Sequence, residues 1–217
     1  MKKEDASRLI TEIGIVPVVR AANAKQALMA VEAVCAGGIP IVEITMTVPG
    51  AIDLIAQIAG SVGATVLVGA GTVLDAETAR RCIAAGAQFV VSPGFDRETI
   101  EIVKREGKVV MAGALTPTEI AAAWKSGADF VKIFPCGPVG GAKYIRALRG
   151  PFPQIPFVPT GGVNLETAAD FIRAGAAALG VGGELVQADA LKAGKGQLIV
   201  ENARKFVEAV HAARAAM

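Results

Sequence analysis

One pattern recurs four times along the chain and constrains its fold more than any other feature. Each copy is an eight-residue run that begins with glycine and continues as an apolar strand, and the copies begin at Gly38, Gly86, Gly127 and Gly175. Each copy follows a stretch of helical character, which a glycine can end in the left-handed conformation at little steric cost. Helices that alternate with buried apolar strands predict parallel βαβ units.

Further strands and helices fill the intervals between these copies. Additional strands are expected at about 15–19, 66–70, 109–112 and 156–160, and helices at about 3–12, 24–36, 50–60, 75–85, 96–106, 117–126, 140–148, 164–174 and 198–214. Eight βα units in this length predict an α/β fold: a (β/α)8 TIM barrel with an extra N-terminal helix, as a single domain over residues 1–217. An open doubly wound sheet uses the same local units, but no single Gly-rich nucleotide fingerprint follows the first strand.

The repeat also sets a register for the barrel interior. The fifth residue after each leading glycine is Glu43, Val91, Lys132 or Gly180, in strands 2, 4, 6 and 8. Alternate strands of an eight-stranded barrel contribute side chains to one interior layer. Because strands 2 and 6 are diametrically opposite, we expect Glu43 and Lys132 to point at each other across the barrel.

Lys132 and Glu43 are costly residues for an apolar interior. Lysine is rarely fully buried, and an unpaired buried charge is strongly unfavourable. Burial favours the neutral amine, which is the form that attacks a carbonyl carbon. Two structural alternatives remain: a lysine whose stem reaches past Phe134 to water, and a buried salt bridge that fixes the register.

The carboxyl ends of the strands, where barrel active sites lie, carry small residues, hydroxyls and exposed backbone amides. Arg20 is the single cation among these strand ends. The strands numbered 7 and 8 end in Thr160-Gly161-Gly162 and Gly182-Gly183, in the two places where backbone N–H groups commonly bind phosphate. Glu184 argues against a phosphate there, because a carboxylate repels a dianion unless it points away.

Composition excludes several classes of function. The chain has 22 Lys and Arg against 20 Asp and Glu, a net charge of +2. This small excess of positive charge does not indicate binding to nucleic acid or to an anionic membrane. The uncharged stretch 54–74 is interrupted by polar residues and glycines, so no spanning helix is expected. The N-terminus is amphipathic and predicts no signal peptide.

The cysteines and the single histidine limit the chemistry further. Cys35, Cys82 and Cys136 are odd in number and form no zinc pattern, which suits a reducing cytoplasm. His211 is the only histidine, so a Ser-His-Asp triad and a multi-histidine metal site are excluded. Cys136 follows the strand of Lys132, but no histidine can serve as its base.

With these residues in place, the chain resembles the class I 2-keto-3-deoxy-6-phosphogluconate (KDPG) aldolase family, which includes bifunctional 4-hydroxy-2-oxoglutarate (KHG) aldolases. The similarity covers almost the whole chain. The motifs that carry it, in order, are Val42-Glu43-Ile44-Thr45, Val68-Gly69-Ala70-Gly71-Thr72, Val91-Ser92-Pro93, Leu115-Thr116-Pro117-Thr118-Glu119, Lys132-Ile133-Phe134-Pro135 and Phe157-Val158-Pro159-Thr160-Gly161-Gly162-Val163-Asn164.

The resemblance implies roles for individual residues and for the assembly. Lys132 would form the Schiff base and Glu43 would be the acid/base, in a homotrimer. The cysteines favour the cytoplasm, and no cofactor or metal is expected. Thr72, Pro93, Phe134 and Thr160 would shape a pyruvate pocket, and Gly161, Gly162 and Gly182 would hold the far end of the substrate. Gly183 stands where many members carry a serine, so it would bind the substrate only through its backbone N–H. Thr47 stands where some members carry an arginine, so anion recognition would rest on Arg20 instead. Arg20 and Thr47 complete the set of predicted substrate-binding residues.

The expected reaction is cleavage of KDPG to pyruvate and glyceraldehyde 3-phosphate, of KHG to pyruvate and glyoxylate, or of both. The sequence does not rank these 2-keto acids or fix the stereochemical preference. Two other classes remain open. One is a sugar-phosphate isomerase or epimerase on the same barrel, and the other is a non-catalytic binding module in which Lys132 and Glu43 form a buried pair.

Overall fold

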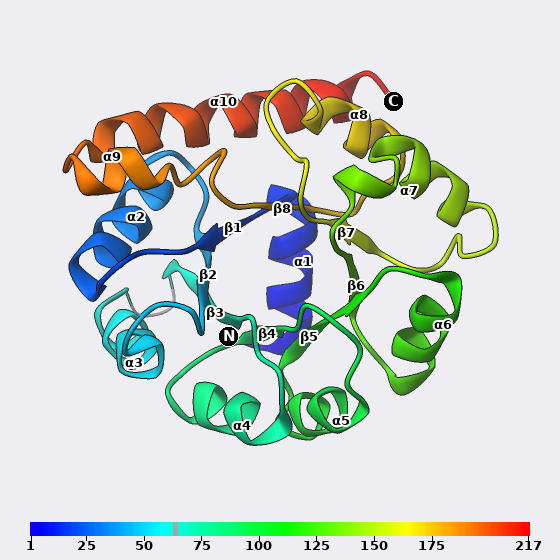
Figure 1. The fold of residues 1–217 in the computed structure, drawn as a ribbon, viewed down its shortest axis with the longest axis horizontal. Coiled ribbons are helices and arrows are strands. Elements are labelled where there is room, and N and C mark those ends of the chain that lie inside the picture. Colours follow the sequence, from blue (N-terminus) through cyan, green and yellow to red (C-terminus); the bar gives the residue numbers. More distant parts are fainter. Residues whose placement is uncertain (63–64) are drawn as a thin grey trace.

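Eight parallel strands form one curved sheet in the computed structural model, which describes residues 1–62 and 65–217 (Figure 1). The strands run in the order β7-β6-β5-β4-β3-β2-β1-β8. An isolated parallel bridge between Thr160 and Gly180 joins the two outer strands and nearly closes the barrel. The strands are β1 (Ile15–Val19), β2 (Ile41–Thr45), β3 (Leu67–Gly71), β4 (Phe89–Val91), β5 (Val109–Ala114), β6 (Phe130–Ile133), β7 (Phe157–Pro159) and β8 (Leu179–Val181).

Helices alternate with these strands and surround the barrel in Figure 1. They are α2 (Ala24–Ala36), α3 (Ala51–Val62), α4 (Ala76–Ala84), α5 (Arg97–Arg105), α6 (Pro117–Ser126), α7 (Ala142–Arg149), α8 (Ala168–Arg173), the short α9 (Ala188–Lys192) and α10 (Gly196–Ala215). The predicted (β/α)8 barrel is therefore confirmed, whereas the prediction that residues 1–217 form a single domain stays a prediction.

The extra N-terminal helix α1 (Lys3–Ile13) lies across the centre of the barrel in Figure 1. Lys3 Nζ lies 2.9 Å from a carboxylate oxygen of Asp129, which directly precedes β6. Arg214 of α10 donates to the carbonyl oxygens of Thr11 and Glu12. These contacts place α1 at the amino ends of the strands, which leaves the carboxyl ends open.

The leading glycines of the repeat have the backbone conformation that the sequence predicts. The φ angles of Gly38, Gly86, Gly127 and Gly175 are 95°, 110°, 94° and 94°, all in the left-handed region. Side-chain caps start many of the helices. Thr116 and Glu119 form a reciprocal capping box at α6, in which two orphan backbone donors are satisfied together.

Two helix predictions differ from the structure, and one short helix was not predicted. The helix expected from 164 begins only at Ala168, because the Asn164 side chain accepts the N–H groups of Glu166 and Thr167 and closes a turn instead. The helix expected from 140 begins at Ala142, since Gly140 and Gly141 have φ angles of 118° and 58°. The sequence analysis did not expect α9.

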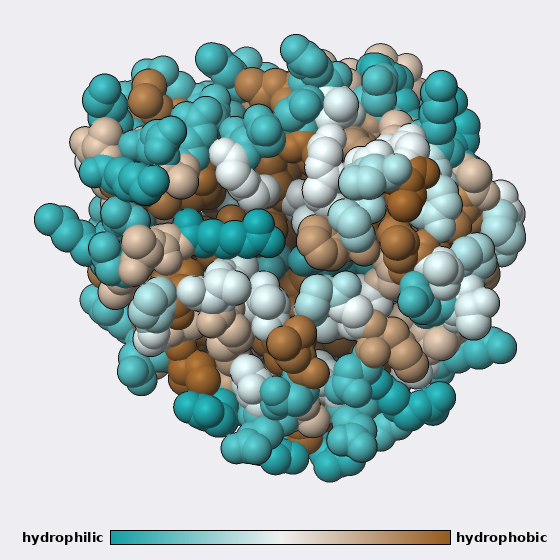
Figure 2. Space-filling view, in the orientation of Figure 1, coloured by the Kyte–Doolittle hydropathy of each residue, from teal (hydrophilic) through white to brown (hydrophobic). Residues whose placement is uncertain are grey.

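The strands are buried along their whole length, and a few polar side chains enter this interior. Glu43 and Lys132 are the only charged residues among the buried ones that the structure describes. In space filling, hydrophilic residues cover most of the periphery, and paler residues surround a hollow near the centre (Figure 2). Within residues 1–62 and 65–217, no helix is long and apolar enough to span a membrane. The stretch 54–74 contributes to α3 and β3, and its residues 63 and 64 lie outside the described residues.

Candidate active site

Lys132 occupies the middle of β6, flanked by Gly113 of β5 and Val158 of β7. Only 5% of the residue is exposed, and its Nζ lies 5.5 Å from the centroid of the Phe134 ring. At this distance the ring face attracts a cationic amine. Among the described residues, none forms an ion pair with Lys132, so its amine is held in place chiefly by packing.

Glu43 occupies the middle of β2, flanked by Val18 of β1 and Gly69 of β3. Only 2% of the residue is exposed, and Oε1 is fully buried without a hydrogen-bond partner among the described residues. Burial raises the pKa of the Glu43 carboxyl, and the positive charges of Lys132 and then Arg20 oppose this rise. A carboxyl whose pKa moves toward neutral pH is suited to accept and return a proton.

Glu43 and Lys132 act on each other electrostatically without forming an ion pair. The positive charge of Lys132 lowers the Glu43 pKa, which places the two groups in one interior region. No nitrogen–oxygen distance within 4.0 Å joins them, although five such pairs occur elsewhere among the described residues. The direct salt bridge weighed as a structural alternative is therefore not formed. A separated carboxylate and amine leave room for a reacting group between them.

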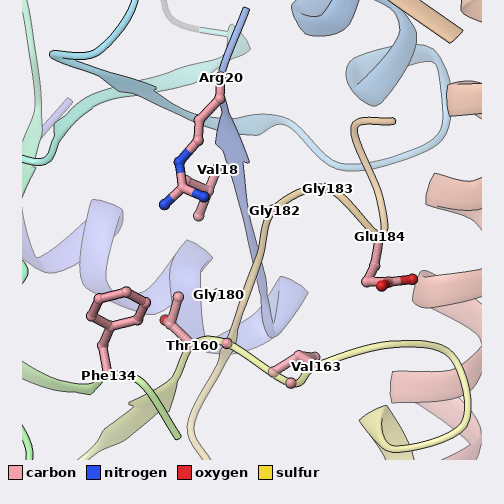
Figure 3. Close-up of a pocket in the computed structure, with 11 residues that line it drawn as sticks. Val18, Arg20, Phe134, Thr160, Val163, Gly180, Gly182, Gly183 and Glu184 are labelled. Atoms are coloured by element: carbon pink, nitrogen blue, oxygen red, sulfur yellow. The ribbon is translucent and has the colours of Figure 1, made fainter. Parts of the chain in front are cut away.

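A pocket of about 130 Å³ opens at the carboxyl ends of β1, β6, β7 and β8 (Figure 3). The Arg20 side chain extends over Val18 into this pocket, and Phe134 and Thr160 lie on its opposite side. Seven of the ten predicted substrate-binding residues line it. They are Arg20, Phe134, Thr160, Gly161, Gly162, Gly182 and Gly183. Because Phe134 also neighbours the Lys132 amine, the pocket adjoins the buried pair.

Backbone amides are available at the β7 and β8 side of the pocket. Among the described residues, none accepts a hydrogen bond from the N–H groups of Gly161, Gly162 or Gly183. The φ angles of Gly161 and Gly162 are 83° and 80°, which glycine adopts without strain. A side chain at Gly162 would also approach Gly137 Cα to 2.7 Å. The glycines therefore permit a tight turn whose unpaired donors can meet an anion or a hydroxyl group.

Thr72 directly follows β3 and has a φ angle of 56°. It is the only residue other than glycine with a positive φ angle in the described part of the chain. A β-branched residue in the left-handed region is an outlier, and strain of this kind gathers at functional sites. The strain is independent support for the predicted role of Thr72, although Thr72 lies outside the pocket described above.

Pro93 and Thr47 also lie outside that pocket. The Pro93 backbone packs so closely on Gly113 that no side chain fits at Gly113. Thr47 lines a different cavity, together with Pro49 and Arg81. Its hydroxyl lies 2.6 Å from that of Thr45, whose own proton goes to the Val19 carbonyl, so Thr47 is the donor of this pair. The structure thus separates Thr47 from the seven predicted binding residues that line the pocket.

The sequence analysis assigned no binding role to Val18, Val163 or Gly180, which also line the pocket. Val18 could have been found, because it lies two residues before Arg20 and strand side chains alternate between faces. Position 180 accommodates only glycine beside the Thr160 side chain, since a Cβ there would overlap Thr160 Oγ1. Glu184 lines the pocket as well, but its carboxylate is directed away from Arg20 in Figure 3.

Cys136 is buried close to the site but is not prepared for nucleophilic attack. Burial raises the pKa of its thiol to about 12, so the thiol stays protonated at neutral pH. Its Sγ lies 3.7 Å from the carbonyl oxygen of Gly141. Among the described residues, no three His, Cys, Asp or Glu side chains gather as a metal-binding group.

Comparison with known proteins identifies the family of this architecture. The family model for KDPG and KHG aldolases matches residues 7–201. A KHG/KDPG aldolase from Escherichia coli (strain K12) is 35% identical over 207 residues, which cover 95% of this chain and 96% of that protein. A 2-dehydro-3-deoxy-phosphogluconate aldolase from Treponema pallidum (strain Nichols) is 37% identical over 163 residues, or 75% of this chain and 77% of that protein.

A solved structure agrees in both fold and sequence. The KDPG aldolase from Legionella pneumophila, with pyruvate captured at low pH as a covalent carbinolamine intermediate, has a TM-score of 0.85 and 30% sequence identity. The match covers 92% of this chain and 96% of that one.

Proposed function

The chain belongs to the KDPG and KHG aldolase family, and we propose that it is a class I aldolase in which Lys132 forms the Schiff base and Glu43 transfers protons. This assignment rests on the Lys132 amine and the Glu43 carboxyl, which are buried beside the pocket and form no ion pair with each other. Its substrates are KDPG, KHG or both.

The first half of the reaction forms the iminium ion. The neutral Lys132 amine attacks the C2 carbonyl of the 2-keto acid, and the carbonyl oxygen takes up a proton to give a carbinolamine. Loss of this hydroxyl as water leaves the positively charged iminium, which can accept an electron pair from the neighbouring carbon. Glu43 in its acid form supplies the proton that the departing hydroxyl needs, and a raised carboxyl pKa makes this form accessible.

The second half breaks the carbon–carbon bond. The Glu43 carboxylate removes the proton of the C4 hydroxyl, directly or through one water molecule. The C3–C4 bonding pair then moves to the iminium, so that an aldehyde leaves and the pyruvate enamine remains on Lys132. Glu43 returns the proton to C3, and water hydrolyses the resulting iminium to release pyruvate and the free amine. Such proton transfer contributes roughly 10²–10⁴-fold to the rate.

The predicted binding residues position the substrate around this pair. The hydroxyls of Thr72 and Thr160 bind the pyruvate carboxylate, and Phe134 packs on the methyl end with Pro93 alongside. Arg20 binds the far end of the substrate, together with the N–H groups of Gly161, Gly162 and Gly183, which have no acceptor among the described residues. Thr47 lines a separate cavity and serves the site only indirectly.

A homotrimer in the cytoplasm is the proposed state of the protein. The trimer rests on the family resemblance. The cytoplasm rests on the three cysteines, all of which are free thiols, since structural disulfides are rare in that reducing compartment.

An imine-trapping experiment tests the function. Borohydride reduction in the presence of pyruvate should fix a stable adduct on Lys132, which peptide mass mapping would locate. Lys132→Ala should give no adduct and no turnover. The matched control is Lys108→Ala, because the Lys108 amine donates to Gln88 at the amino end of the barrel. Absence of an adduct, with pyruvate bound, would overturn the assignment and favour the isomerase or the non-catalytic module.

A further inference from the structure

The charges at the mouth of the pocket balance to zero. Among the described residues that line it, Arg20 is the one cation and Glu184 is the one carboxylate. Lys132 and Glu43 are buried in the interior and do not line this pocket. A phosphoryl group brings close to two negative charges at neutral pH, so this mouth offers it no net attraction.

Glu184 stands next to the donors that a substrate tail would use. It directly follows Gly183, whose N–H has no acceptor in the described part of the chain, and it shares the pocket with Gly161 and Gly162. The side chain is exposed and forms no hydrogen bond or ion pair with any described residue, so its carboxylate can rotate toward the pocket. Its backbone carbonyl is held by the Asn202 amide at 3.1 Å, which fixes where the side chain starts.

The surface beyond Glu184 also carries carboxylate and amide side chains. An adjoining cavity contains Glu184 again, with Asn164, Glu166, Gln187 and Asn202. No lysine or arginine of the described chain lines it. A dianion would therefore meet acceptors of like charge at this end, whereas a hydroxyl group can both accept from the free amides and donate to a carboxylate.

We propose that Glu184 is a specificity-determining residue, and that the aldolase also cleaves unphosphorylated 2-keto-3-deoxy sugar acids whose far end carries hydroxyl groups. This inference rests on the proposed function and uses the same bond cleavage, with a neutral hydroxyaldehyde as the leaving product. The terminal hydroxyls of the substrate donate to the Glu184 carboxylate and accept from the N–H groups of Gly161, Gly162 or Gly183.

Steady-state kinetics with 2-keto-3-deoxygluconate and its 6-phosphate test the inference on the full-length protein. The wild type should cleave the unphosphorylated acid with a kcat/KM no more than about tenfold below that of the phosphate. Glu184→Gln removes the charge but keeps the shape, and it should raise kcat/KM for the phosphate about tenfold. The matched control is Glu101→Gln, which alters an exposed glutamate of α5 that lines neither cavity and should leave the ratio of the two kcat/KM values unchanged.

The outcomes separate the two proposals. The role of Glu184 would be overturned if the wild-type kcat/KM for the phosphate exceeds that for the unphosphorylated acid by more than about 100-fold. It would also be overturned if Glu184→Gln leaves the ratio of these two kcat/KM values unaltered. Both results would leave aldolase chemistry intact as long as pyruvate still forms its imine. A protein that forms no imine with pyruvate would instead contradict the proposed function itself.

Discussion

Gly71 leaves the space that the Glu43 carboxylate occupies. A Cβ built on Gly71 overlaps Glu43 Oε1, so any side chain at position 71 must displace the carboxylate. The two residues lie on adjacent strands, where Glu43 pairs with Gly69 and Thr45 pairs with Gly71. The glycine is thus required for the close approach of the Glu43 side chain, and its own φ angle does not require glycine.

Gly71→Ala should therefore reduce turnover while leaving the barrel folded. Displacing the Glu43 carboxylate disturbs proton transfer, and we expect kcat to fall by roughly 10²-fold or more. The measurement is kcat with the circular dichroism spectrum taken alongside. Gly60→Ala is the control, because a Cβ at this helical glycine meets nothing within 4 Å and should preserve activity. Normal turnover in Gly71→Ala would contradict the proposed role of Glu43.

The raised pKa of Glu43 predicts that Glu43→Gln and the wild type differ in their free energy of unfolding by an amount that depends on pH. Because the folded protein holds the Glu43 proton more tightly than the unfolded chain, ionising this group costs folding free energy as the pH rises. Glu43→Gln should match the wild type below the ordinary pKa of glutamate and become the more stable protein as the pH rises through the raised value.

Urea unfolding over a pH series measures this difference between Glu43→Gln and the wild type. The same variant should lose about 10²–10⁴-fold in kcat, since glutamine cannot take up a proton. A stability difference that stays constant with pH would show that the carboxyl has an ordinary pKa in the folded protein.

Arg20 contributes to the pKa of Glu43, which predicts a shift in the pH dependence of the rate. Removing this positive charge takes away one of the two influences that lower the Glu43 pKa. In Arg20→Met the acidic limb of the kcat/KM profile should therefore move to higher pH. Arg81→Met serves as the comparison, because Arg81 lines the separate cavity of Thr47. An acidic limb that stays in place would exclude electrostatic coupling between Arg20 and Glu43.

The left-handed backbone of Thr72 predicts opposite effects on stability and activity. A β-branched residue in this region costs of order 1–3 kcal/mol, which glycine avoids at an entropic cost of about 0.5–1 kcal/mol. Thr72→Gly should therefore unfold at a slightly higher temperature but bind pyruvate less well, because the hydroxyl is lost. Thr72→Ser keeps the hydroxyl and should keep the KM. If Thr72→Gly keeps the wild-type KM, the hydroxyl has no part in binding.

The sequence analysis predicted the barrel from the four glycine-led repeats, and the structure confirms it. Local rules were sufficient there, since each leading glycine ends a helix in the left-handed region and each strand that follows is buried. The same register predicted Glu43 and Lys132 in the interior, where both are buried. Their catalytic roles, and those of the binding residues, stay predictions.

Only the tertiary structure decided which strand ends form the pocket. Arg20, Phe134, Thr160 and the glycines after β7 and β8 meet because the bridge between Thr160 and Gly180 brings the ends of the sheet together. Thr47 carries a similar hydroxyl at a similar strand end, yet it lies in another cavity.

Local periodicity specifies which face of a strand a residue takes, because successive side chains alternate. The distance between two strand ends depends instead on how the whole sheet closes. The sequence by itself therefore determined the strands, their order along the chain and the two buried charges. The closed sheet decided which of the small and polar residues share one pocket with them.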